Sequence, residues 1–197
     1  MQSEEPKESL AEIVRRYEEK YRKGYGMGAT AGHRMTMQEA RLFRDRGVKT
    51  ILDVGCGRGL IINELLVWDF DVKGTEIVPY LFDIDLRGLP VVEIPVQKLA
   101  KEFDPGSFDL VLMIDLLDHL RTDHEIFEAM ETARFLANKG FLLTVNGYSS
   151  MKTFHFCAEE WLDKVRYHFP AAMLRKDRSG AILVQAWRAD EDITFSR

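Results

Sequence analysis

Residues 51–60, ILDVGCGRGL, constrain the fold more than any other part of this sequence. The segment opens as an apolar strand with one carboxylate, Asp53, and then places three glycines at alternate positions, Gly55, Gly57 and Gly59. The residues that follow, LIINELLVW, have the character of a buried helix. A strand, a tight glycine turn and a helix form the unit from which α/β proteins are built, and such proteins bind ligands at the carboxyl end of the strand. We therefore expect a ligand site at residues 55–59.

Apolar runs and helical patterns alternate along the rest of the chain. The runs predict strands at 51–54, 72–75, 91–94, 108–114, 141–145, 171–175 and 181–188, the last two joined as a hairpin by KDRSG. The patterns predict helices at 60–68, near 80–85, near Leu99, from the capping pair Thr122 and Glu125 to a turn at Lys139–Gly140, and at 158–169, with a loop at 146–157. The helix after Thr122 is expected to turn five residues inward: Ile126, Phe127, Met130, Ala133 and Leu136. This alternation predicts an α/β fold, a doubly wound, seven-stranded, mostly parallel sheet with a C-terminal antiparallel hairpin and helices on both faces.

The residues before the sheet predict two helices. Ser9 and Glu12 have the spacing of a capping box, and the helix that they begin would end at Gly24. A glycine-bearing connection, YGMGATAGH, leads to a second helix that is expected to start at Thr36 and Glu39 and to stop at Gly47. We expect residues 1–197 to form a single domain, in which 1–47 supply N-terminal helices and a candidate lid and 48–197 form the core.

Charge and cysteine content narrow the classes of partner and compartment. A net charge of −5 argues against a broadly basic surface and so disfavours nucleic acid as a partner. A local basic patch in the first helix keeps that class open: Arg15, Arg16, Lys20, Arg22 and Lys23. Cys56 and Cys157 fit neither a disulfide framework nor a metal site, and no apolar stretch reaches the roughly 18 residues that span a membrane. We expect a cytoplasmic protein without a membrane partner, present as a monomer or a homodimer.

The glycine spacing and two carboxylates indicate what kind of ligand the turn binds. Dinucleotide-binding turns have the pattern G-x-G-x-x-G, whereas this chain has G-x-G-x-G. Asp53, two residues before the first glycine, would repel a phosphate but suits a cationic amino group. Glu76, at the end of the next apolar run, can accept hydrogen bonds from the two hydroxyls of a ribose in either kind of site. The ligand is expected to be adenosine-like.

Three motifs in order, ILDVGCGRG, VKGTEIV and FDLVLMIDLLDHL, resemble those of the class I S-adenosylmethionine-dependent methyltransferases over about Val48 to Val145. The resemblance implies that the glycines line the methionine part of the cofactor, that Asp53 lies near its amino group and that Glu76 holds the ribose hydroxyls. It further implies adenine contacts from Ile77, Val96 and Gln97, and flanking positions for Asp115 and Leu116. Cys56 completes the cofactor loop, with its side chain expected to point away. The chain departs from the family after the third strand, where EIPVQKL stands in place of a frequent aspartate.

Three residues are candidates for a catalytic role: Asp115, His119 and His33. Asp115 and His119 follow the fourth strand, where a general base could take a proton from the methyl acceptor. The competing interpretation is that catalysis rests on proximity and alignment, with His119 packing to hold its turn. His33, like His155 and Phe156, lies in a segment that could close over the site, and we expect no metal because the acidic and histidine residues at 115–124 match no standard ligand spacing.

The function that these motifs imply is transfer of a methyl group from S-adenosylmethionine to an N, O or C nucleophile of a small or modest-sized acceptor. The limited elaboration around the core favours a small acceptor. Two alternatives stay open, a methyltransferase that acts on a protein or nucleic acid, and a non-catalytic subunit that only binds S-adenosylmethionine. A nicotinamide-dependent oxidoreductase is the remaining alternative, and titration with the dinucleotide would detect it.

Overall fold

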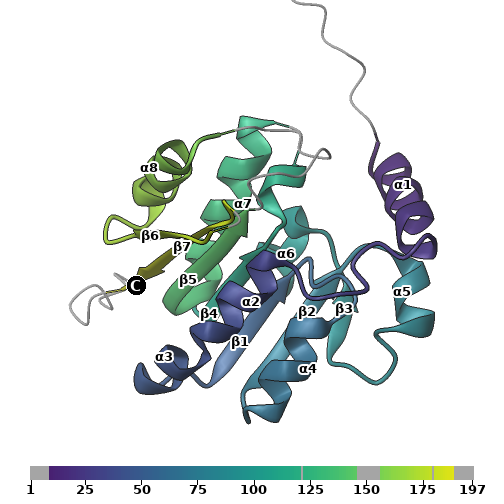
Figure 1. Cartoon of the computed structure of the whole chain (residues 1–197), viewed down its shortest axis with the longest axis horizontal. Coiled ribbons are helices and arrows are strands. Elements are labelled where there is room, and N and C mark those ends of the chain that lie inside the picture. The colour runs from purple at the N-terminus through teal and green to yellow at the C-terminus, as the bar shows by residue number, and fades with distance from the viewer. Residues whose placement is uncertain (1–8, 121, 146–155, 179, 189–197) are drawn as a thin grey trace, which may run out of the picture.

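The computed structural model describes residues 9–120, 122–145, 156–178 and 180–188. Its centre is a seven-stranded sheet in the order β3-β2-β1-β4-β5-β7-β6 (Figure 1). The strands are β1 Thr50–Val54, β2 Asp71–Glu76, β3 Val91–Glu93, β4 Phe108–Ile114, β5 Ala137–Val145, β6 Met173–Lys176 and β7 Ile182–Trp187. The first five are parallel, and β7 runs antiparallel to both of its neighbours. The predicted fold is thus confirmed, and strand order reverses between β1 and β4, where α/β sheets bind their ligands.

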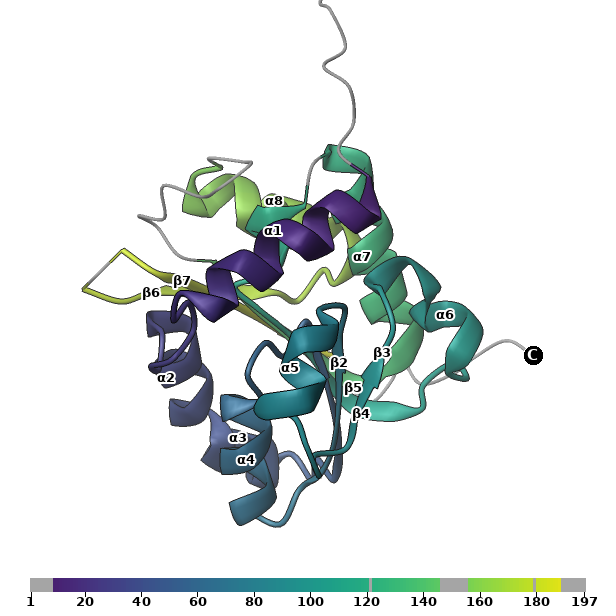
Figure 2. The same ribbon diagram turned by 90° about the vertical axis from the view of Figure 1, so that its right-hand side faces the viewer.

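Helices cover both faces of this sheet (Figure 1). They are α1 Leu10–Arg22, α2 Ala31–Gln38, α3 Ala40–Asp45, α4 Leu60–Val67, α5 Pro79–Ile84, α6 Leu99–Glu102, α7 Asp123–Leu136 and α8 Ala158–His168, with short 3₁₀ turns η1 Val96–Lys98 and η2 Leu117–His119. Buried residues of α2, α3 and α4 pack on one face and those of α7 and α8 on the other. Helix α1 lies across the carboxyl end of the sheet, above α5 and between α2 and α7 (Figure 2).

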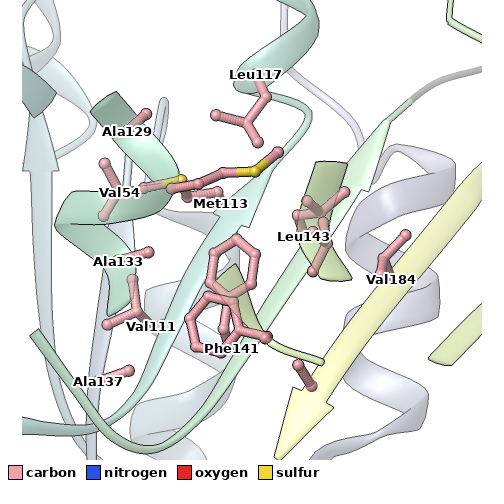
Figure 3. Packing of buried hydrophobic residues seen from close by; sticks show 14 of the residues in the cluster. Val54, Val111, Met113, Leu117, Ala129, Ala133, Ala137, Phe141, Leu143 and Val184 are labelled. Carbon is pink, nitrogen blue, oxygen red and sulfur yellow. The ribbon is translucent and has the colours of Figure 1, made fainter. Parts of the chain in front are cut away.

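The central strands are apolar on both sides, as parallel strands buried between helices must be. Phe141 of β5 is fully buried on the α7 and α8 face, and its ring stacks on that of Phe169 with centroids 5.0 Å apart. Figure 3 shows the same layer, in which small side chains of α7 lie beside larger ones on the strands: Ala129, Ala133, Val111, Met113 and Leu143. Leu142, the next residue after Phe141, belongs to the core of the opposite face. Alternate residues of one strand therefore tie the two helical layers to a single sheet.

The prediction of a helix start at Thr36 was wrong. Helix α2 begins at Ala31, because the Thr30 side chain accepts a hydrogen bond from the His33 N–H at 3.0 Å and so forms the cap. The Thr36 hydroxyl instead donates to the Gly32 carbonyl inside the helix, at 2.9 Å. Glu39, which has the spacing of a capping residue, pairs with Arg175 of β6 and separates α2 from α3.

Two further predictions near α7 were wrong. Lys139–Gly140 is not a turn, since β5 begins at Ala137 directly after the helix. Gly140 lies opposite Trp187 of β7, and a Cβ there would come within 2.6 Å of the indole ring, so close packing rather than a turn requires this glycine. Phe127 does not face inward but is 42% exposed and lies against the rings of Tyr167 and His168. The predicted loop at 146–157 falls mostly outside the described residues, as does His155.

Candidate active site

The glycine loop between β1 and α4 has a backbone that other residues adopt at a cost. Gly55, Gly57 and Gly59 have φ angles of 70°, 54° and 73°, in the left-handed region. Neighbouring side chains also leave no room, since a Cβ would lie 2.9 Å from Leu116 at Gly55 and 2.6 Å from Leu89 at Gly59. The alternating glycines thus let the backbone turn tightly at the strand end where the sheet order reverses.

Two cavities lie around this loop at the carboxyl end of the sheet. The first, of about 500 Å³, lies over the ends of β2, β3 and β4, and the second, of about 320 Å³, lies between the glycine loop and α2. Of the predicted residues, the first is lined by Gly55, Glu76, Ile77, Val96, Gln97, Asp115, Leu116 and His119, and the second by His33, Asp53, Gly55, Cys56, Gly57 and Asp115. Gly59 lines neither. Four residues line both cavities and mark where these meet: Tyr21, Tyr25, Gly55 and Asp115.

Asp53 places a buried carboxyl group beneath the second cavity. Its side chain is 1% exposed, and Oδ2 has no hydrogen-bond partner among the described residues. Burial, with a smaller effect of nearby Glu76, raises the pKa of Asp53 to about 7. A buried acid without a partner is costly once ionised, and a cationic amino group in the cavity would supply the missing charge.

Replacement of the Asp53 carboxyl group should raise the melting temperature of the free protein but lower its affinity for the ligand. A raised folded-state pKa means that the contribution of Asp53 to stability is fully present below the ordinary carboxyl pKa of about 4 and is lost as pH rises from there through about 7. The gain in melting temperature of Asp53→Asn, which is neutral throughout, over the parent protein should therefore be larger at about pH 8 than at about pH 5.5, when no ligand is present. Because the resemblance to the methyltransferases implies that Asp53 holds the amino group of the cofactor, the same substitution should weaken S-adenosylhomocysteine binding about tenfold or more, through loss of a charge-assisted hydrogen bond. Thermal melts at the two pH values and calorimetric titration measure both effects, and equal destabilisation at both pH values would contradict the assignment.

Glu76 organises the loops at the ends of β1 and β2. Its Oε2 accepts a hydrogen bond from the Gly57 N–H at 2.9 Å, and Oε1 accepts from the N–H groups of Ile77 at 2.7 Å and Val78 at 3.2 Å. Burial raises the pKa of Glu76, and these three hydrogen bonds oppose that rise. The carboxylate lines the first cavity, where its remaining lone pairs suit the hydroxyls of a ribose.

Cys56 contributes its backbone to the loop while its thiol packs below. The Cys56 N–H donates to the Thr75 carbonyl, at 2.9 Å, which ties the loop to β2. The sulfur lies 3.1 Å from the place that a Cβ at Gly74 would occupy, among the partly buried residues of the core. Burial raises the pKa of this thiol well above its usual value. The thiol is therefore protonated and unreactive at neutral pH.

Three tyrosines, Tyr17, Tyr21 and Tyr25, line the cavities on the side formed by α1 and the turn after it, and are called the tyrosine stripe below. The rings lie 5.5 to 6.3 Å apart between centroids, and they come from α1 and the turn after it. Burial raises the pKa of each, so all three are neutral hydroxyls at physiological pH. These residues were not identified from the sequence as part of the site; the four-residue spacing of Tyr17 and Tyr21, which places both on one face of a helix, was the available signal.

Arg58, between the second and third glycines, connects this stripe to the glycine loop through hydrogen bonds. Its Nε donates to the Tyr25 carbonyl at 2.8 Å, a terminal nitrogen donates to the Tyr21 carbonyl at 2.5 Å, and the other pairs with Asp85. The Arg58 side chain is only 8% exposed. Sequence reasoning missed this residue, because bonds to backbone carbonyls 33 and 37 positions away depend on no particular residue type.

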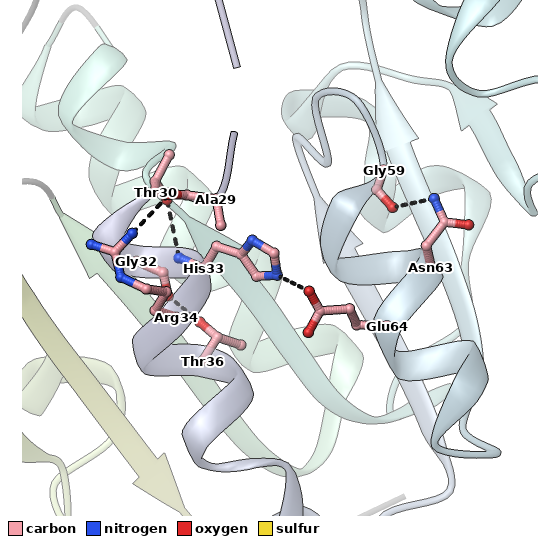
Figure 4. A network of polar contacts seen from close by, with 9 residues as sticks. All are labelled: Ala29, Thr30, Gly32, His33, Arg34, Thr36, Gly59, Asn63 and Glu64. Carbon is pink, nitrogen blue, oxygen red and sulfur yellow. Dashed lines mark hydrogen bonds and ion pairs between the residues drawn. The ribbon is translucent and has the colours of Figure 1, made fainter. Parts of the chain in front are cut away.

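The three catalytic candidates occupy different places. Asp115 lies where the cavities meet, with a φ of 52°, and its Oδ1 accepts a hydrogen bond from the Thr144 hydroxyl at 2.8 Å. His119 lines only the first cavity and lies edge-on to the Tyr17 ring, with centroids 5.9 Å apart. His33 lines only the second cavity, and its Nε2 lies 2.9 Å from an oxygen of Glu64 on α4 (Figure 4). The three side chains therefore do not share one cavity, because Asp115 lines both, His119 only the first and His33 only the second.

The described residues contain neither a candidate metal site nor a helix that could span a membrane. No three acidic, histidine or cysteine residues among them are grouped as a metal site would require. In the same part of the chain, every helix is too short or too polar to cross a membrane. The two cavities thus remain the candidate site.

Comparison with known proteins identifies what such a site belongs to. A family model described as a methyltransferase domain matches residues 28–189. A ubiquinone biosynthesis O-methyltransferase of Paraburkholderia xenovorans is 30% identical over 90 residues, which are 43% of this chain and 39% of that protein. The chain thus aligns with less than half the length of the curated relatives described here.

Solved structures share the fold at low sequence identity. The 1,6-didemethyltoxoflavin-N1-methyltransferase of Burkholderia thailandensis, solved with bound 1,6-didemethyltoxoflavin and S-adenosylhomocysteine, has a TM-score of 0.69 at 18% identity, and the match covers 95% of this chain and 93% of that one. The magnesium protoporphyrin IX methyltransferase of Synechocystis, with bound S-adenosylhomocysteine, has a TM-score of 0.66 at 16% identity, over 90% of this chain and 99% of that one.

The residues of the two cavities fit the cofactor that these structures hold. Asp53 has an oxygen without a partner for an amino group, the glycine loop has space that side chains would fill, and the Glu76 carboxylate lines the first cavity. The matched model spans most of the chain, including the glycine loop and both carboxylates. With its seven-stranded fold and this cofactor site, the chain belongs to the methyltransferase-domain family of class I S-adenosylmethionine-dependent methyltransferases.

Proposed function

We propose that this protein transfers a methyl group from S-adenosylmethionine to a small acceptor at the junction of the two cavities. The observation that carries the proposal is that Tyr21, Tyr25, Gly55 and Asp115 line both cavities. A ligand whose adenosine part occupies the first cavity and whose amino-acid part occupies the second has its sulfur at this junction. The reacting methyl group would then face Tyr21, Tyr25 and Asp115.

The chain's own residues would hold the two ends of the cofactor. Asp53 would pair with the amino group, and Glu76 would accept hydrogen bonds from the ribose hydroxyls. Ile77 and Leu116 would pack on the adenine, with Val96 and Gln97 at its edge: all four line the first cavity. When bound, the cofactor supplies an electrophilic methyl carbon. The protein's part is to align the acceptor in line with it and to keep water out.

Enclosure of the junction supports a small acceptor over a macromolecular one. Helix α1 lies across the strand ends (Figure 2), and Arg58 bonds the chain at Tyr21 and Tyr25 to the glycine loop. A protein or nucleic acid would need an open surface at this point. The relatives named above agree in kind, since their names give ubiquinone biosynthesis, a toxoflavin precursor and a porphyrin. We place the activity in the cytoplasm, in a monomer or homodimer, in keeping with two free cysteines.

Binding and turnover measured on the same preparation test this proposal. Calorimetric titration with S-adenosylhomocysteine should show one saturable site, and radiolabelled S-adenosylmethionine should transfer its methyl group to members of a small-molecule library. Saturable binding with no transfer to any small molecule would favour the non-catalytic subunit, and transfer only to protein or nucleic acid would favour a macromolecular acceptor. Saturation by a nicotinamide dinucleotide, with none by S-adenosylhomocysteine, would overturn the cofactor assignment.

A further inference from the structure

His33, which is buried and lines the second cavity, forms an imidazole and carboxylate pair with Glu64 of α4, whose side chain is 51% exposed. The His33 residue is 6% exposed, and its Nε2 lies 2.9 Å from Oε1 of Glu64 (Figure 4). The other ring nitrogen, Nδ1, is buried and has no hydrogen-bond partner among the described residues. A buried polar atom without a partner is rare in folded proteins and points to a ligand or a chemical role.

The Glu64 contact determines which nitrogen of His33 can accept a proton. A carboxylate accepts hydrogen bonds, so in the neutral ring the proton resides on Nε2 and the lone pair on Nδ1. The same carboxylate would stabilise the positive charge that the ring gains on accepting a second proton. This arrangement, in which an acid orients a histidine and supports its charge, is that of a general base.

The start of α2 holds His33 next to the junction of the cavities. The Thr30 side chain caps the helix by accepting from the His33 N–H at 3.0 Å. Gly32 is pressed against the ends of β4 and β5, where a Cβ would overlap the Thr144 hydroxyl and lie 2.6 Å from Oδ1 of Asp115. Asp115 lines both cavities and therefore lies where the methyl group would be transferred. His33 directly follows Gly32, the residue that lies against Asp115.

The other charged and titratable groups of the second cavity have different partners or assignments. Asp115 accepts from Thr144, and Arg58 is bonded to Asp85 and two carbonyls. The Cys56 thiol has a raised pKa, as do the hydroxyls of Tyr21 and Tyr25. Asp53 is assigned to the amino group of the cofactor. Among the described residues lining this cavity, His33 Nδ1 is thus the base left for the acceptor.

We propose that His33, oriented by Glu64, is the general base of this methyltransferase and that its acceptor is an aromatic hydroxyl compound, uncharged at neutral pH. The proposal rests on the proposed function above. The acceptor O–H bond breaks, its proton passes to Nδ1, and its electron pair forms the bond from oxygen to the methyl carbon. The bond between that carbon and sulfur breaks with its electron pair left on sulfur, and the proton then leaves His33 for solvent. A hydroxyl needs such a base because its oxygen is a poor nucleophile until the proton departs, and the rings of Tyr21 and Tyr25 suit an aromatic acceptor.

Two acceptors that differ in acidity test the role directly. Catechol keeps its protons at about pH 7, whereas 4-nitrocatechol is largely ionised at about pH 8 and needs no base. His33→Gln keeps a donor near the position of Nε2 for Glu64 but removes Nδ1. With saturating S-adenosylmethionine, the variant should lose about 10²- to 10⁴-fold in kcat with catechol and about threefold or less with 4-nitrocatechol.

Matched variants separate catalysis from folding and from cofactor binding. Glu64→Gln removes the charge that supports the imidazolium and should lose about tenfold with catechol only. His168→Asn changes a second buried histidine, whose Nδ1 lies 2.6 Å from Glu131 away from both cavities, and should leave kcat unchanged. Affinity for S-adenosylhomocysteine should match the parent in all three variants. Equal losses with both acceptors, or a parallel loss of cofactor affinity, would overturn the base assignment. A parent protein that binds S-adenosylhomocysteine but methylates neither compound would overturn the acceptor class while leaving the cofactor assignment standing.

Discussion

Glu76→Ala is expected to weaken S-adenosylhomocysteine binding by about 100-fold or more. The substitution removes the proposed acceptor for the ribose hydroxyls and also the partner of three backbone N–H groups, those of Gly57, Ile77 and Val78. Each buried donor left without a partner costs about 1–3 kcal/mol of stability, whereas the loss of two hydrogen bonds from ribose hydroxyls to a carboxylate, about 1.5–3 kcal/mol each, corresponds to about 100-fold or more in affinity. Calorimetric titration at fixed salt and pH measures the loss.

Two companion variants make this result specific. Glu93 lies opposite Glu76 in the pairing of β2 with β3, but it is exposed and lines neither cavity, so Glu93→Ala should bind like the parent protein. Glu76→Gln keeps one acceptor oxygen and should lose about tenfold, between the two extremes. Affinity of Glu76→Ala within about threefold of the parent, in a protein that still melts cooperatively, would show that Glu76 does not hold the ribose.

Arg58→Ala should release the tyrosine stripe from the glycine loop. The guanidinium binds the carbonyls of Tyr21 and Tyr25 and pairs with Asp85, and its loss leaves a partly buried carboxylate and two carbonyls without that partner. Removing one member of a buried ion pair costs about 3–5 kcal/mol, somewhat less here because Asp85 is 25% exposed. We expect a lower melting temperature, roughly tenfold or greater loss of S-adenosylhomocysteine affinity, and faster amide exchange at residues 20–28.

Arg44 provides a matched control for this variant. It also donates to a backbone carbonyl, that of Trp68 at 2.5 Å, and lies over the Trp68 ring at 5.0 Å, but it lines neither cavity. Arg44→Ala should affect stability only. Arg58→Lys keeps the charge and loses the fork that reaches three acceptors, so most of the loss should persist. If Arg58→Ala raised exchange throughout the chain and not chiefly at 20–28, the residue would be a general structural support.

The sheet could be predicted well from short stretches of sequence, because neighbouring residues specify each strand and the turn after it. The central strands β1, β4 and β5 are five, seven and nine residues long, each contains a mostly apolar run, and the glycine loop follows β1 directly. The errors arose where the same local pattern has two uses. Thr36 and Glu39 have the spacing of a helix start, yet Thr30 caps the helix, and the Glu39 side chain pairs instead with Arg175, 136 positions away. Lys139–Gly140 resembles a turn, yet Trp187 on a distant strand explains the glycine.

The candidate site likewise contains residues that local sequence identifies and residues that depend on contacts between distant parts of the chain. Asp53, Glu76 and the glycines could be selected from the sequence because each lies at or just after the carboxyl end of a strand, and all of them except Gly59 line at least one of the two cavities. The partnership of Glu64 with His33 could not be predicted, because it joins two helices from different parts of the chain. Arg58 escaped for a different reason, since its partners include backbone carbonyls that any sequence supplies.

The tyrosine stripe and the carboxylates belong to separate stretches of the chain. Asp53 and Glu76 end strands of the sheet, whereas the wall that the stripe forms over both cavities comes from residues that precede the sheet. Thr30, as the cap of α2, marks the boundary between the two stretches. A chimera joined at Thr30 would receive a different wall from another family member and keep the donor-holding residues unchanged. Divergence in what is methylated can therefore proceed by exchange of the first thirty residues, without any change to the strands.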